Sequence, residues 1–489
     1  MAGKKVAIIG AGWYGCHTAL VLSKQGCDVT LYEKNSEILN EISGNFGVRL
    51  HLGLHYPRSE QTRQNCREEY DEFLRTYPDL VNHHESSIYG LGKVDANGLP
   101  SKVPAKDFEA LAAERQGLNI VDPEKLGYKN LHTAIDTTEA SIVVGGKLRL
   151  KFNEYLAETT VKINLSTTVN SVTRDADGKI SVSTQGNPPE EFDSVINATS
   201  YHRFLPDRKL PFNIEVAYQV CAGLLYEDTQ EKEKGAARPF IVMDGWFPCL
   251  MLYDDGAVKE NSQYIVIHGK WTILHTFGTE QEARQQLFKD LHNRELQDKV
   301  EKACTEHLSN FYPEFSERFK PVDWKLNVLA KLKTDKEFRS TIVFQDAETS
   351  IIHIIPGKVG GVASAAQEIQ TLLSSERTEN KILCENGYCY VANGVLAKGK
   401  EEASEKPKDW SRNTCGLQTA KEITESSPVL PALEIAAQTL GSRDKSSPKA
   451  PGIVIKRKLS SSSSSFFMAA ERRCSNKAPN TKPYSPLHA

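Results

Sequence analysis

The sequence predicts an α/β fold with three parts: a parallel-sheet domain built from separate segments of the chain, an antiparallel β-rich domain, and a disordered C-terminal tail. Three observations predict it. A strand, a glycine-rich turn, a helix and a second strand follow one another within residues 5–34. Several β-rich, aromatic segments occur between residues 216 and 271. After about residue 375, serine and proline become frequent and apolar residues lose their periodicity.

The N-terminal unit has the order of a Rossmann-like dinucleotide-binding domain. Val6–Ile9 is a short apolar run, as expected of a strand buried on both faces of a parallel sheet. Cys16–Lys24 has helical spacing, and Val29–Tyr32 is a second buried strand that ends at Glu33 and Lys34. This strand–helix–strand unit frames the glycine-rich turn.

Each glycine of the turn has a physical role. Gly10 permits the tight turn off the strand, Gly12 lets the backbone approach a diphosphate, and Gly15 lets helix and strand pack closely. The N-terminus of the helix offers free N–H groups to the phosphates. Glu33 can accept both hydroxyl groups of an adenosine ribose and repels a 2′-phosphate, which disfavours an NADP-type ligand.

Composition narrows the function further. With 489 residues the chain is long enough for two or three domains, and a net charge of −3 does not suggest a nucleic-acid partner. No apolar run approaches the roughly 20 residues that span a bilayer. The chain enters its first strand at once and its ten cysteines are scattered, which predicts reduced thiols and a cytoplasmic protein without a signal peptide. Cys384 and Cys389 lack a second pair or nearby histidines, so we expect no metal site.

The next part of the chain alternates helices and strands. Ser43–Gly47 is expected to form a flexible loop, followed by the segment Arg49–Tyr56, which is rich in glycine and rings. Further elements are predicted by their periodicity: helices at Glu60–Tyr77 and Gly145–Leu156, strands at Ser87–Val94, Val161–Asn164, Thr168–Thr173, Ile180–Thr184 and Phe192–Ala198, and a short helix with a strand in Val103–Asp122. The strand Phe192–Ala198 ends in Asn197-Ala198-Thr199, where a backbone of small residues could lie against a ligand.

The second half contains the antiparallel sheet and a closing unit. The sheet is predicted from the segments Val216–Tyr226, Phe240–Met243, Cys249–Tyr253 and Tyr264–Trp271. One long helical region, Glu280–Phe311, follows them. The strand Ile351–Ile355 then enters the turn Pro356–Gly361, which leads into the helix Val362–Leu373.

The order of these motifs resembles that of the D-amino-acid-oxidase superfamily, which includes glycine oxidase, sarcosine oxidase, L-2-hydroxyglutarate dehydrogenase and glycerol-3-phosphate dehydrogenase. The resemblance is carried by the opening fingerprint, the stretch Arg49–Tyr56, the exit at Asn197–Thr199 and the turn at Gly357-Lys358, and it covers Val6 to Leu373. It implies that the dinucleotide is FAD and that the FAD-binding domain is discontinuous. The implied FAD-binding domain comprises residues 1–85, 140–205 and 335–375, the implied substrate domain comprises 86–139 and 206–334, and the tail comprises 376–489.

The resemblance also implies hydride transfer from a carbon that bears an amine or a hydroxyl to flavin N5, with FAD performing the difficult step. The implied cofactor contacts are Gly10, Gly12, Gly15, Glu33, Lys34, His51, Val169, Ala198, Thr199, Gly357, Lys358 and Gly360. Lys358 would place positive charge near flavin N1 and O2, although a solvated turn lysine is the alternative.

Several site residues remain open between functional and structural roles. His51 either packs by the flavin ring or is linked to it covalently. His55 or Tyr56 is expected to line the substrate pocket, and His55 is also a catalytic candidate. Arg58 either grips a substrate carboxylate or caps the following helix. In the antiparallel sheet, Tyr218, Tyr253, His268 and Lys270 are polar groups set in apolar strands, and a bound substrate is a candidate partner for them. His268 is proposed as the catalytic base or orienting group, and a histidine satisfied within the core is the alternative.

Two departures from the superfamily leave the substrate open. The segment His51–His55 carries two histidines and two leucines where better-known members carry one histidine and smaller residues, and no arginine motif of the amino-acid oxidases is found. We therefore predict an FAD-dependent oxidoreductase that acts on a small amine or 2-hydroxy compound. A flavin monooxygenase and a flavin-binding scaffold without turnover, whose tail recruits a protein partner, remain the alternatives.

Overall fold

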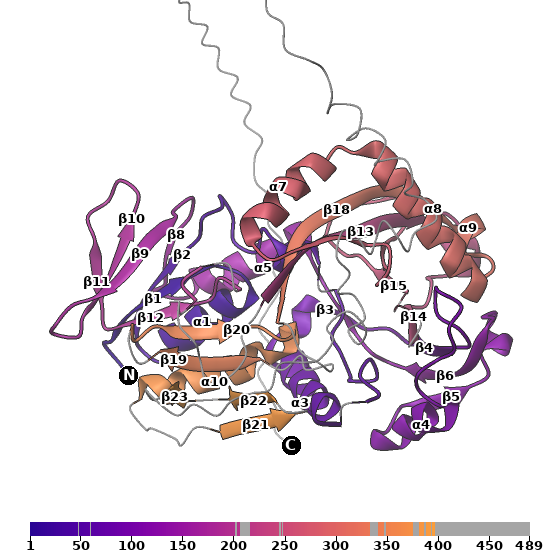
Figure 1. Ribbon diagram of the computed structural model, residues 1–489, viewed down its shortest axis with the longest axis horizontal. Helices are drawn as coiled ribbons and strands as arrows, with labels where there is room; N and C mark the ends of the chain where they lie inside the picture. The colour runs from indigo at the N-terminus through magenta and orange to yellow at the C-terminus, as the bar shows by residue number, and fades with distance from the viewer. Residues whose placement is uncertain are drawn as a thin grey trace, which may run out of the picture. The chain divides into compact units, whose positions relative to one another are not determined.

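The computed structural model describes residues 1–46, 48–58, 60–200, 203–205, 216–243, 246, 248–332, 341–346 and 349–374, together with the backbone of 381–385, 388–392 and 394–396. Two large sheets organise these residues, one of seven strands and one of nine (Figure 1). The chain passes between the two sheets several times, so segments far apart in sequence complete each sheet.

The seven-stranded sheet is mostly parallel. Its spatial order is β23-β19-β20-β12-β1-β2-β8, and only β19 and β20 pair in antiparallel fashion. Its strands are β1 (Lys5–Ile9), β2 (Asp28–Tyr32), β8 (Lys162–Asn164), β12 (Ser194–Asn197), β19 (Ile342–Asp346), β20 (Ile352–Ile355) and β23 (Gly394–Leu396). Because β1 lies between β12 and β2, it is central and apolar on both faces, as the sequence predicts.

Strand alternation gives this sheet two different covers. Val6 and Ile8 point into a core shared with helices, whereas Ala7 and Ile9 point into a smaller core shared with a three-stranded antiparallel sheet. The helices are α1 (Trp13–Lys24), α3 (Glu60–Thr76), α5 (Gly145–Ala157) and α10 (Val362–Leu373), and the three strands are β9 (Val169–Arg174), β10 (Ile180–Thr184) and β11 (Glu190–Phe192). The seven-stranded sheet is therefore the middle layer of three.

The nine-stranded sheet is mostly antiparallel, with β14 and β4 as a parallel pair. Its strands are β4 (Ser87–Gly92), β5 (Asn119–Val121), β6 (Leu131–Thr137), β13 (Val216–Asp228), β14 (Phe240–Met243), β15 (Cys249–Leu252), β16 (Gln263–Ile267), β17 (Ile273–Phe277) and β18 (Phe319–Leu332). The long strands β13 and β18 pair along their whole length and form the longest strand pair of this sheet. The helices α7 (Glu280–Asp290), α8 (Arg294–Phe311) and α9 (Phe315–Arg318) lie over the β13–β18 side of this sheet (Figure 1).

The two faces of the nine-stranded sheet are buried in different cores. On β13, Val220 and Leu224 pack in the core that includes α8 residues, whereas Leu225 packs in a second core with Val48 and Leu54 of the segment before α3. Figure 1 shows the short helix α4 (Ala105–Ala110) beside β5 and β6. The face of the nine-stranded sheet that carries Leu225 is therefore the one that meets the ring-rich segment predicted near the cofactor.

Several elements differ from the predictions. The expected loop at Ser43–Gly47 contains the short helix α2 (Ile42–Asn45), and the strand expected at Tyr264–Trp271 ends at Ile267. The expected helix Glu280–Phe311 is two helices, because the Asn293 side chain accepts a hydrogen bond from the Leu296 amide and starts α8 anew. The strands β6, β17, β18 and β19 were not predicted from the sequence.

Small elements complete the described chain. They are α6 (Glu231–Lys234), β3 (Val81–Asn82), β7 (Ser141–Ile142), β21 (Lys381–Glu385) and β22 (Tyr388–Ala392), with 3₁₀ turns at Pro78–Leu80, Leu111–Glu114, Glu124–Leu126 and Val359–Gly361. The strands β21, β22 and β23 lie within residues 376–489, the segment predicted as the tail. The rest of that tail lies outside the described residues. The domain boundaries given above stay a prediction.

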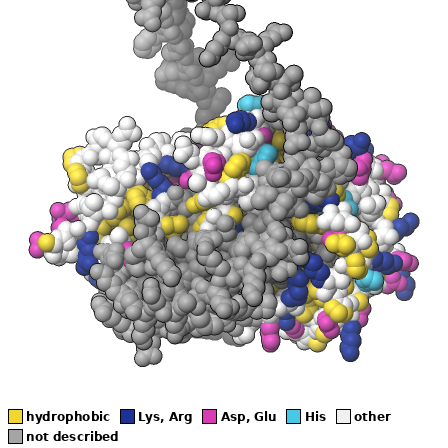
Figure 2. Space-filling model, in the orientation of Figure 1, with side chains coloured by type: hydrophobic (Ala, Val, Ile, Leu, Met, Phe, Trp, Pro, Cys, Tyr) yellow, Lys and Arg dark blue, Asp and Glu magenta, His cyan; other side chains and the backbone are white. Residues whose placement is uncertain are grey.

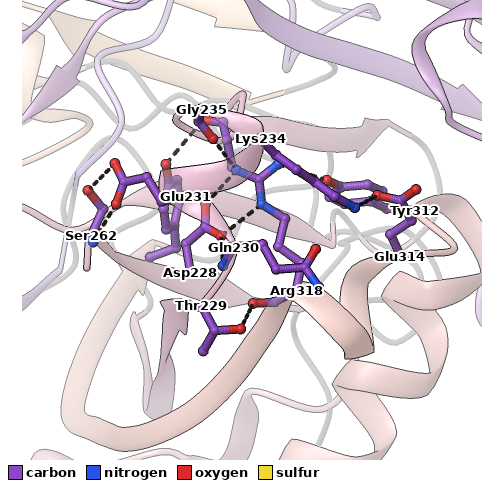
Figure 3. A network of polar contacts seen from close by, with 12 residues as sticks. Asp228, Thr229, Gln230, Glu231, Lys234, Gly235, Ser262, Tyr312, Glu314 and Arg318 are labelled. Atoms are coloured by element: carbon purple, nitrogen blue, oxygen red, sulfur yellow. Dashed lines mark hydrogen bonds and ion pairs between the residues drawn. The ribbon is translucent and has the colours of Figure 1, made fainter. Parts of the chain in front are cut away.

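A buried ion pair fixes the far end of the β13–β18 ribbon (Figure 3). Arg318 donates from Nε and Nη2 to the two carboxylate oxygens of Asp228, at 2.8 and 2.6 Å, and Nη2 also donates to the Gly235 carbonyl. Asp228 is completely buried. Thr229 donates from its amide and its hydroxyl to the Arg318 carbonyl, at 2.9 and 2.8 Å. The planar guanidinium therefore joins the end of β13 to α6 and to the start of β18.

We expect Asp228→Asn to lower the free energy of unfolding by about 3–5 kcal/mol, because it leaves the Arg318 charge buried without its counter-ion. Urea unfolding of the FAD-saturated protein measures this change. The control is Glu260→Gln, which removes the exposed pair with Lys232 and should leave the unfolding midpoint unchanged. Equal midpoints for Asp228→Asn and the control would show that the buried pair contributes nothing.

Candidate functional site

The glycine-rich turn after β1 leaves no room for side chains. Gly10 has φ +101° and donates its amide to the Tyr32 carbonyl at 2.8 Å. A Cβ on Gly10 would lie 2.7 Å from the Ala198 carbonyl oxygen, and one on Gly15 would overlap the Gly10 carbonyl. The turn therefore needs glycine at both positions in order to pack against the end of β12.

At Gly12 the backbone faces a more open space. A Cβ there would meet only the Ser43 hydroxyl, at 3.1 Å. Helix α1 begins after Gly12 with no side-chain cap and no acidic residue in its first turn. The Trp13 amide donates to the Ser43 hydroxyl at 3.2 Å. The first turn of α1 thus adds no carboxylate of its own to the positive end of the helix dipole, which suits an anionic group.

Glu33 lies at the end of β2, next to this turn. Its carboxylate accepts a hydrogen bond from the Ala11 amide at 2.8 Å through Oε2. Its Oε1 accepts from the Asn35 amide at 2.9 Å and from the Asn35 side chain at 2.8 Å. The residue is only 8 % exposed, so the position of its carboxylate is set by the turn itself.

The backbone around β12 and β9 closes the other side of the turn. The Ala198 amide donates to the Ile9 carbonyl at 2.9 Å, and the Thr199 amide donates to the Asn197 side chain at 3.1 Å. The Val169 carbonyl accepts from Arg203 at 3.1 Å. Ala198 and Thr199 therefore follow the carboxyl end of β12, and Val169 begins β9 in the neighbouring layer. Their contacts with the cofactor stay a prediction.

Lys34 belongs to a chain of charges between the two halves of the molecule. It pairs at 2.7 Å with Glu41, which pairs at 3.0 Å with Arg284 of α7. Burial opposes ionisation of Glu41, but the charges of Lys34 and Arg284 outweigh it and lower the pKa of this carboxyl to about 2. Arg284 also pairs with Glu280. Glu41 thus links Arg284 of α7 to Lys34, which follows β2.

Two distant segments meet at a group of rings. The His51 and His55 ring centroids are 5.2 Å apart, and the Tyr56 ring lies 5.1 Å from that of His55. The Lys358 ammonium lies 4.1 Å from the centroid of the Tyr56 ring. The structure therefore brings together four predicted site residues, from the segment before α3 and from the turn after β20.

Two hydroxyl groups, those of Tyr14 and Thr341, hydrogen-bond to the backbone of the turn that carries Lys358. Tyr14 of α1 hydrogen-bonds to the Lys358 carbonyl and, at 2.7 Å, to the Thr341 hydroxyl. The Gly357 amide donates to that Thr341 hydroxyl at 3.3 Å. These contacts place the turn over the N-terminal part of α1, close to the same helix that begins at Gly12.

Sequence reasoning missed a buried network behind the ring segment. Glu139, with no exposed surface, accepts hydrogen bonds from the Leu52 amide and the Tyr89 hydroxyl, each at 2.8 Å, and from Arg49 at 3.3 Å. Burial raises the pKa of Glu139, and the charge of Arg49 opposes this shift. The one signal in the sequence is an acidic residue amid small and apolar neighbours, which is too weak to identify such a role.

A second missed residue, Arg63 of α3, holds the end of the ring segment. It donates to the carbonyls of Tyr56 and Pro57 at 3.1 and 2.9 Å, and it pairs with Glu114 at 2.8 Å. Arg58 lies exposed on the adjoining turn. Its proposed grip on a substrate carboxylate stays a prediction.

The two tyrosine candidates near the nine-stranded sheet, Tyr218 of β13 and Tyr253 just after β15, pack in different cores. Tyr253 packs in the core that contains Val48 and Leu54, and burial followed by the charge of Asp255 raises its pKa to about 12. Tyr218 lies in the core on the other face, with the residues of α8. Tyr253 is therefore the one of the two that shares a core with the ring segment.

His268 does not join this group. It has no exposed surface, its Nε2 is 2.9 Å from Nδ1 of His307 in α8, and its Nδ1 accepts the Lys270 amide at 3.0 Å. Burial lowers the pKa of His268 well below its usual value. The interpretation of His268 as a catalytic base is not retained, because both ring nitrogens are occupied within the protein core.

Comparisons with known proteins agree with this architecture. A family model described as FAD dependent oxidoreductase (DAO) matches residues 5–306. The chain belongs to the DAO family of FAD-dependent oxidoreductases, so it is a flavoprotein enzyme whose cofactor is FAD, and the superfamily predicted from the sequence is confirmed.

Particular relatives carry names that bear on the reaction. The chain is 40% identical over 421 residues to the FAD-dependent monooxygenase kojA of Aspergillus flavus, which covers 85% of this chain and 96% of the relative. It is 26% identical to the FAD-dependent monooxygenase FPY4 of Fusarium mangiferae, over 76% of this chain and 91% of the relative. Among solved structures, NikD, an unusual amino acid oxidase essential for nikkomycin biosynthesis, superposes with a TM-score of 0.55 at 16% identity over 78% of this chain and 96% of that chain. This last likeness shows the fold alone.

The residues at the turn fit FAD. The backbone at Gly12 is bare, the first turn of α1 lacks any competing carboxylate, and Glu33 offers acceptors at the end of β2. We expect the diphosphate to lie against the backbone at Gly12, and the adenosine ribose to bind the Glu33 carboxylate.

The described residues can also be compared with what a membrane span, a metal site or a charged partner would require. No helix among them is long and apolar enough to cross a membrane, and in the same residues no three His, Cys, Asp or Glu side chains cluster as metal ligands. On the described part of the face in Figure 2, basic and acidic side chains are interspersed. The cytoplasmic location stays a prediction, and the proposed partner-binding part of the tail lies outside the described residues.

The two glycines should behave differently when replaced. Gly12→Ala should fold, because its Cβ meets only the Ser43 hydroxyl, yet should bind FAD at least about tenfold more weakly because the methyl group occupies the space expected for the diphosphate. Gly15→Ala should not give a folded protein. Titration of the apoprotein with FAD, beside circular dichroism, measures both effects. Gly278→Ala, where a Cβ meets nothing within 4 Å, is the control. Unchanged FAD affinity in Gly12→Ala would remove the diphosphate from this turn.

Proposed function

We propose that the protein oxidises a small amine or 2-hydroxy compound by removing a hydride from the carbon that bears the amine or hydroxyl. FAD supplies the two-electron acceptor for this step, at flavin N5. The observation that carries the proposal is the meeting of Lys358 with the ring group His51, His55 and Tyr56. Flavin oxidation of this kind needs fixed positive charge near the cofactor and a walled pocket for the substrate, and these residues can supply both.

Each residue has a distinct role in this proposal. Lys358 holds positive charge at the turn after β20, and the hydroxyl groups of Tyr14 and Thr341 fix the backbone of that turn. His55 and Tyr56 form one wall of the substrate pocket, and His51 packs beside them. Because Arg63 and Glu139 bind the backbone at both ends of this segment, its rings stay in place as substrate enters.

A monooxygenase is the second candidate, because two relatives, one of them 40% identical, carry that name. The two reactions differ in their source of electrons. A substrate oxidised by hydride transfer reduces the flavin without any other reductant. A flavin monooxygenase needs an external electron donor and inserts one atom of oxygen into its product.

Anaerobic mixing with a panel of amines, amino acids and 2-hydroxy acids tests the first candidate. We expect at least one compound to bleach the flavin absorbance in the absence of NADH and NADPH. If bleaching requires NADH or NADPH and the product carries oxygen from ¹⁸O₂, the monooxygenase is correct. If neither occurs, the protein acts as a flavin-binding scaffold.

Lys358→Met should retain FAD but slow flavin reduction by about 100-fold, because the fixed positive charge that stabilises the charge developing on reduction is lost. Stopped-flow absorbance at the flavin maximum measures the rate. Lys5→Met is the matched control, since Lys5 also lies over a ring, that of Phe192 at 4.8 Å, in β1. A reduction rate for Lys358→Met within twofold of the control would exclude Lys358 from the reaction.

A further inference from the structure

Helix α3 places a carboxyl group directly against the turn that carries Lys358. A Cβ on Gly360 would lie 3.0 Å from Cβ of Glu69, and one on Gly361 would lie 3.1 Å from its Oε1. A Cβ at either glycine would therefore crowd Glu69, and at Gly361 it would also overlap the Thr341 hydroxyl. The acid packs on the backbone of the same turn whose lysine faces the ring group.

The lysine and the acid share one neighbour. Cys66 precedes Glu69 by three residues, so both side chains lie on one face of α3. The Lys358 ammonium acts on Cys66 by its charge and by a hydrogen bond, and it acts on Glu69 by its charge. Cys66 is 1 % exposed. A buried thiol and a half-buried acid therefore surround the inner side of the lysine.

Few other ionisable groups face Glu69. On α3 itself, the neighbouring carboxylate Glu68 is exposed. From α1, the Tyr14 hydroxyl approaches Gly361, and from the turn after β20 there is Lys358. Burial raises the pKa of Glu69 to about 7, the charge of Lys358 opposes that shift, and Glu68 adds to it. Near neutral pH the carboxyl is therefore poised between its two protonation states.

We propose that Glu69 is a positioning residue that sets the net charge around Lys358 by taking up one proton from solvent when the cofactor is reduced. An O–H bond forms on the carboxylate, no other bond of the protein changes, and the two electrons come from the reductant. The lysine then faces the reduced cofactor without a competing carboxylate. The inference rests on the proposed placement of the cofactor beside Lys358.

The test is the midpoint potential of the bound FAD as a function of pH, measured by equilibrium redox titration against a reference dye. Uptake of one proton by a two-electron couple corresponds to a tenfold change in the equilibrium per pH unit, or about 30 mV. Because Glu69 is already protonated below its pKa of about 7, the wild-type potential should fall more steeply above that pH. Glu69→Gln should lack this steepening and should therefore have the higher potential at pH 8.

Two variants serve as controls. Glu68→Gln removes the exposed neighbour and should keep the steepening. Glu69→Asp retains a carboxyl group, so its potential should also steepen with pH, but at a shifted pH. If the Glu69→Gln curve parallels the wild-type curve, the inference is overturned. If Glu69→Gln does not hold FAD, the wild-type curve decides: without a steepening between pH 6 and 9, the inference is also overturned.

The titration needs no substrate, so its outcome is separate from that of the substrate panel. A failed panel with a steepening abolished in Glu69→Gln would reject the proposed reaction and keep the role of Glu69. If a panel compound bleaches the flavin but the potential shows no steepening, the proposed reaction is supported and the role of Glu69 is rejected.

Discussion

The hydrogen bond from the Ala11 amide to the Glu33 carboxylate is the contact on which the rest of the structure depends. It joins the carboxyl end of β2 to the turn after β1, while the Gly10 amide binds the Tyr32 carbonyl across the same gap. A short, tight turn results, and α1 starts with no acidic residue in its first turn. The sheet, the position of α1 and the space expected for the cofactor all follow from this geometry.

A second constraint joins this unit to the nine-stranded sheet. Arg49 and Glu139 are buried together, and Tyr89 of β4 donates to the same carboxylate. Burying an ion pair costs solvation, so we attribute its presence to the alignment it gives: Glu139 also binds the Leu52 amide and thereby fixes the ring segment. The charges of Lys34, Glu41 and Arg284 join the two halves at another point. The ring segment is thus tied to the nine-stranded sheet through Glu139 and Tyr89.

Local signals made part of this architecture predictable. Val6–Glu33 could be interpreted because strand, turn and helix follow one another without interruption, and Val362–Leu373 begins and ends as predicted. The faces of the nine-stranded sheet could not be assigned, because alternation shows that residues point to opposite sides but not which side meets the cofactor. His268 follows the end of β16, so the alternation of that strand could not show that its ring would meet His307 of α8. Glu139 and Glu69 were missed because their partners come from segments about 87 and 290 residues away in sequence.

The most direct measurement is the binding of FAD and FMN to the apoprotein, compared by isothermal titration calorimetry. If the turn and Glu33 grip the adenosine diphosphate half, FAD binds one to one, and FMN, which lacks the adenosine, binds at least about a thousandfold more weakly. Equal affinity for the two flavins would contradict the account, because the unit at Gly10–Glu33 would then contribute nothing to holding the cofactor.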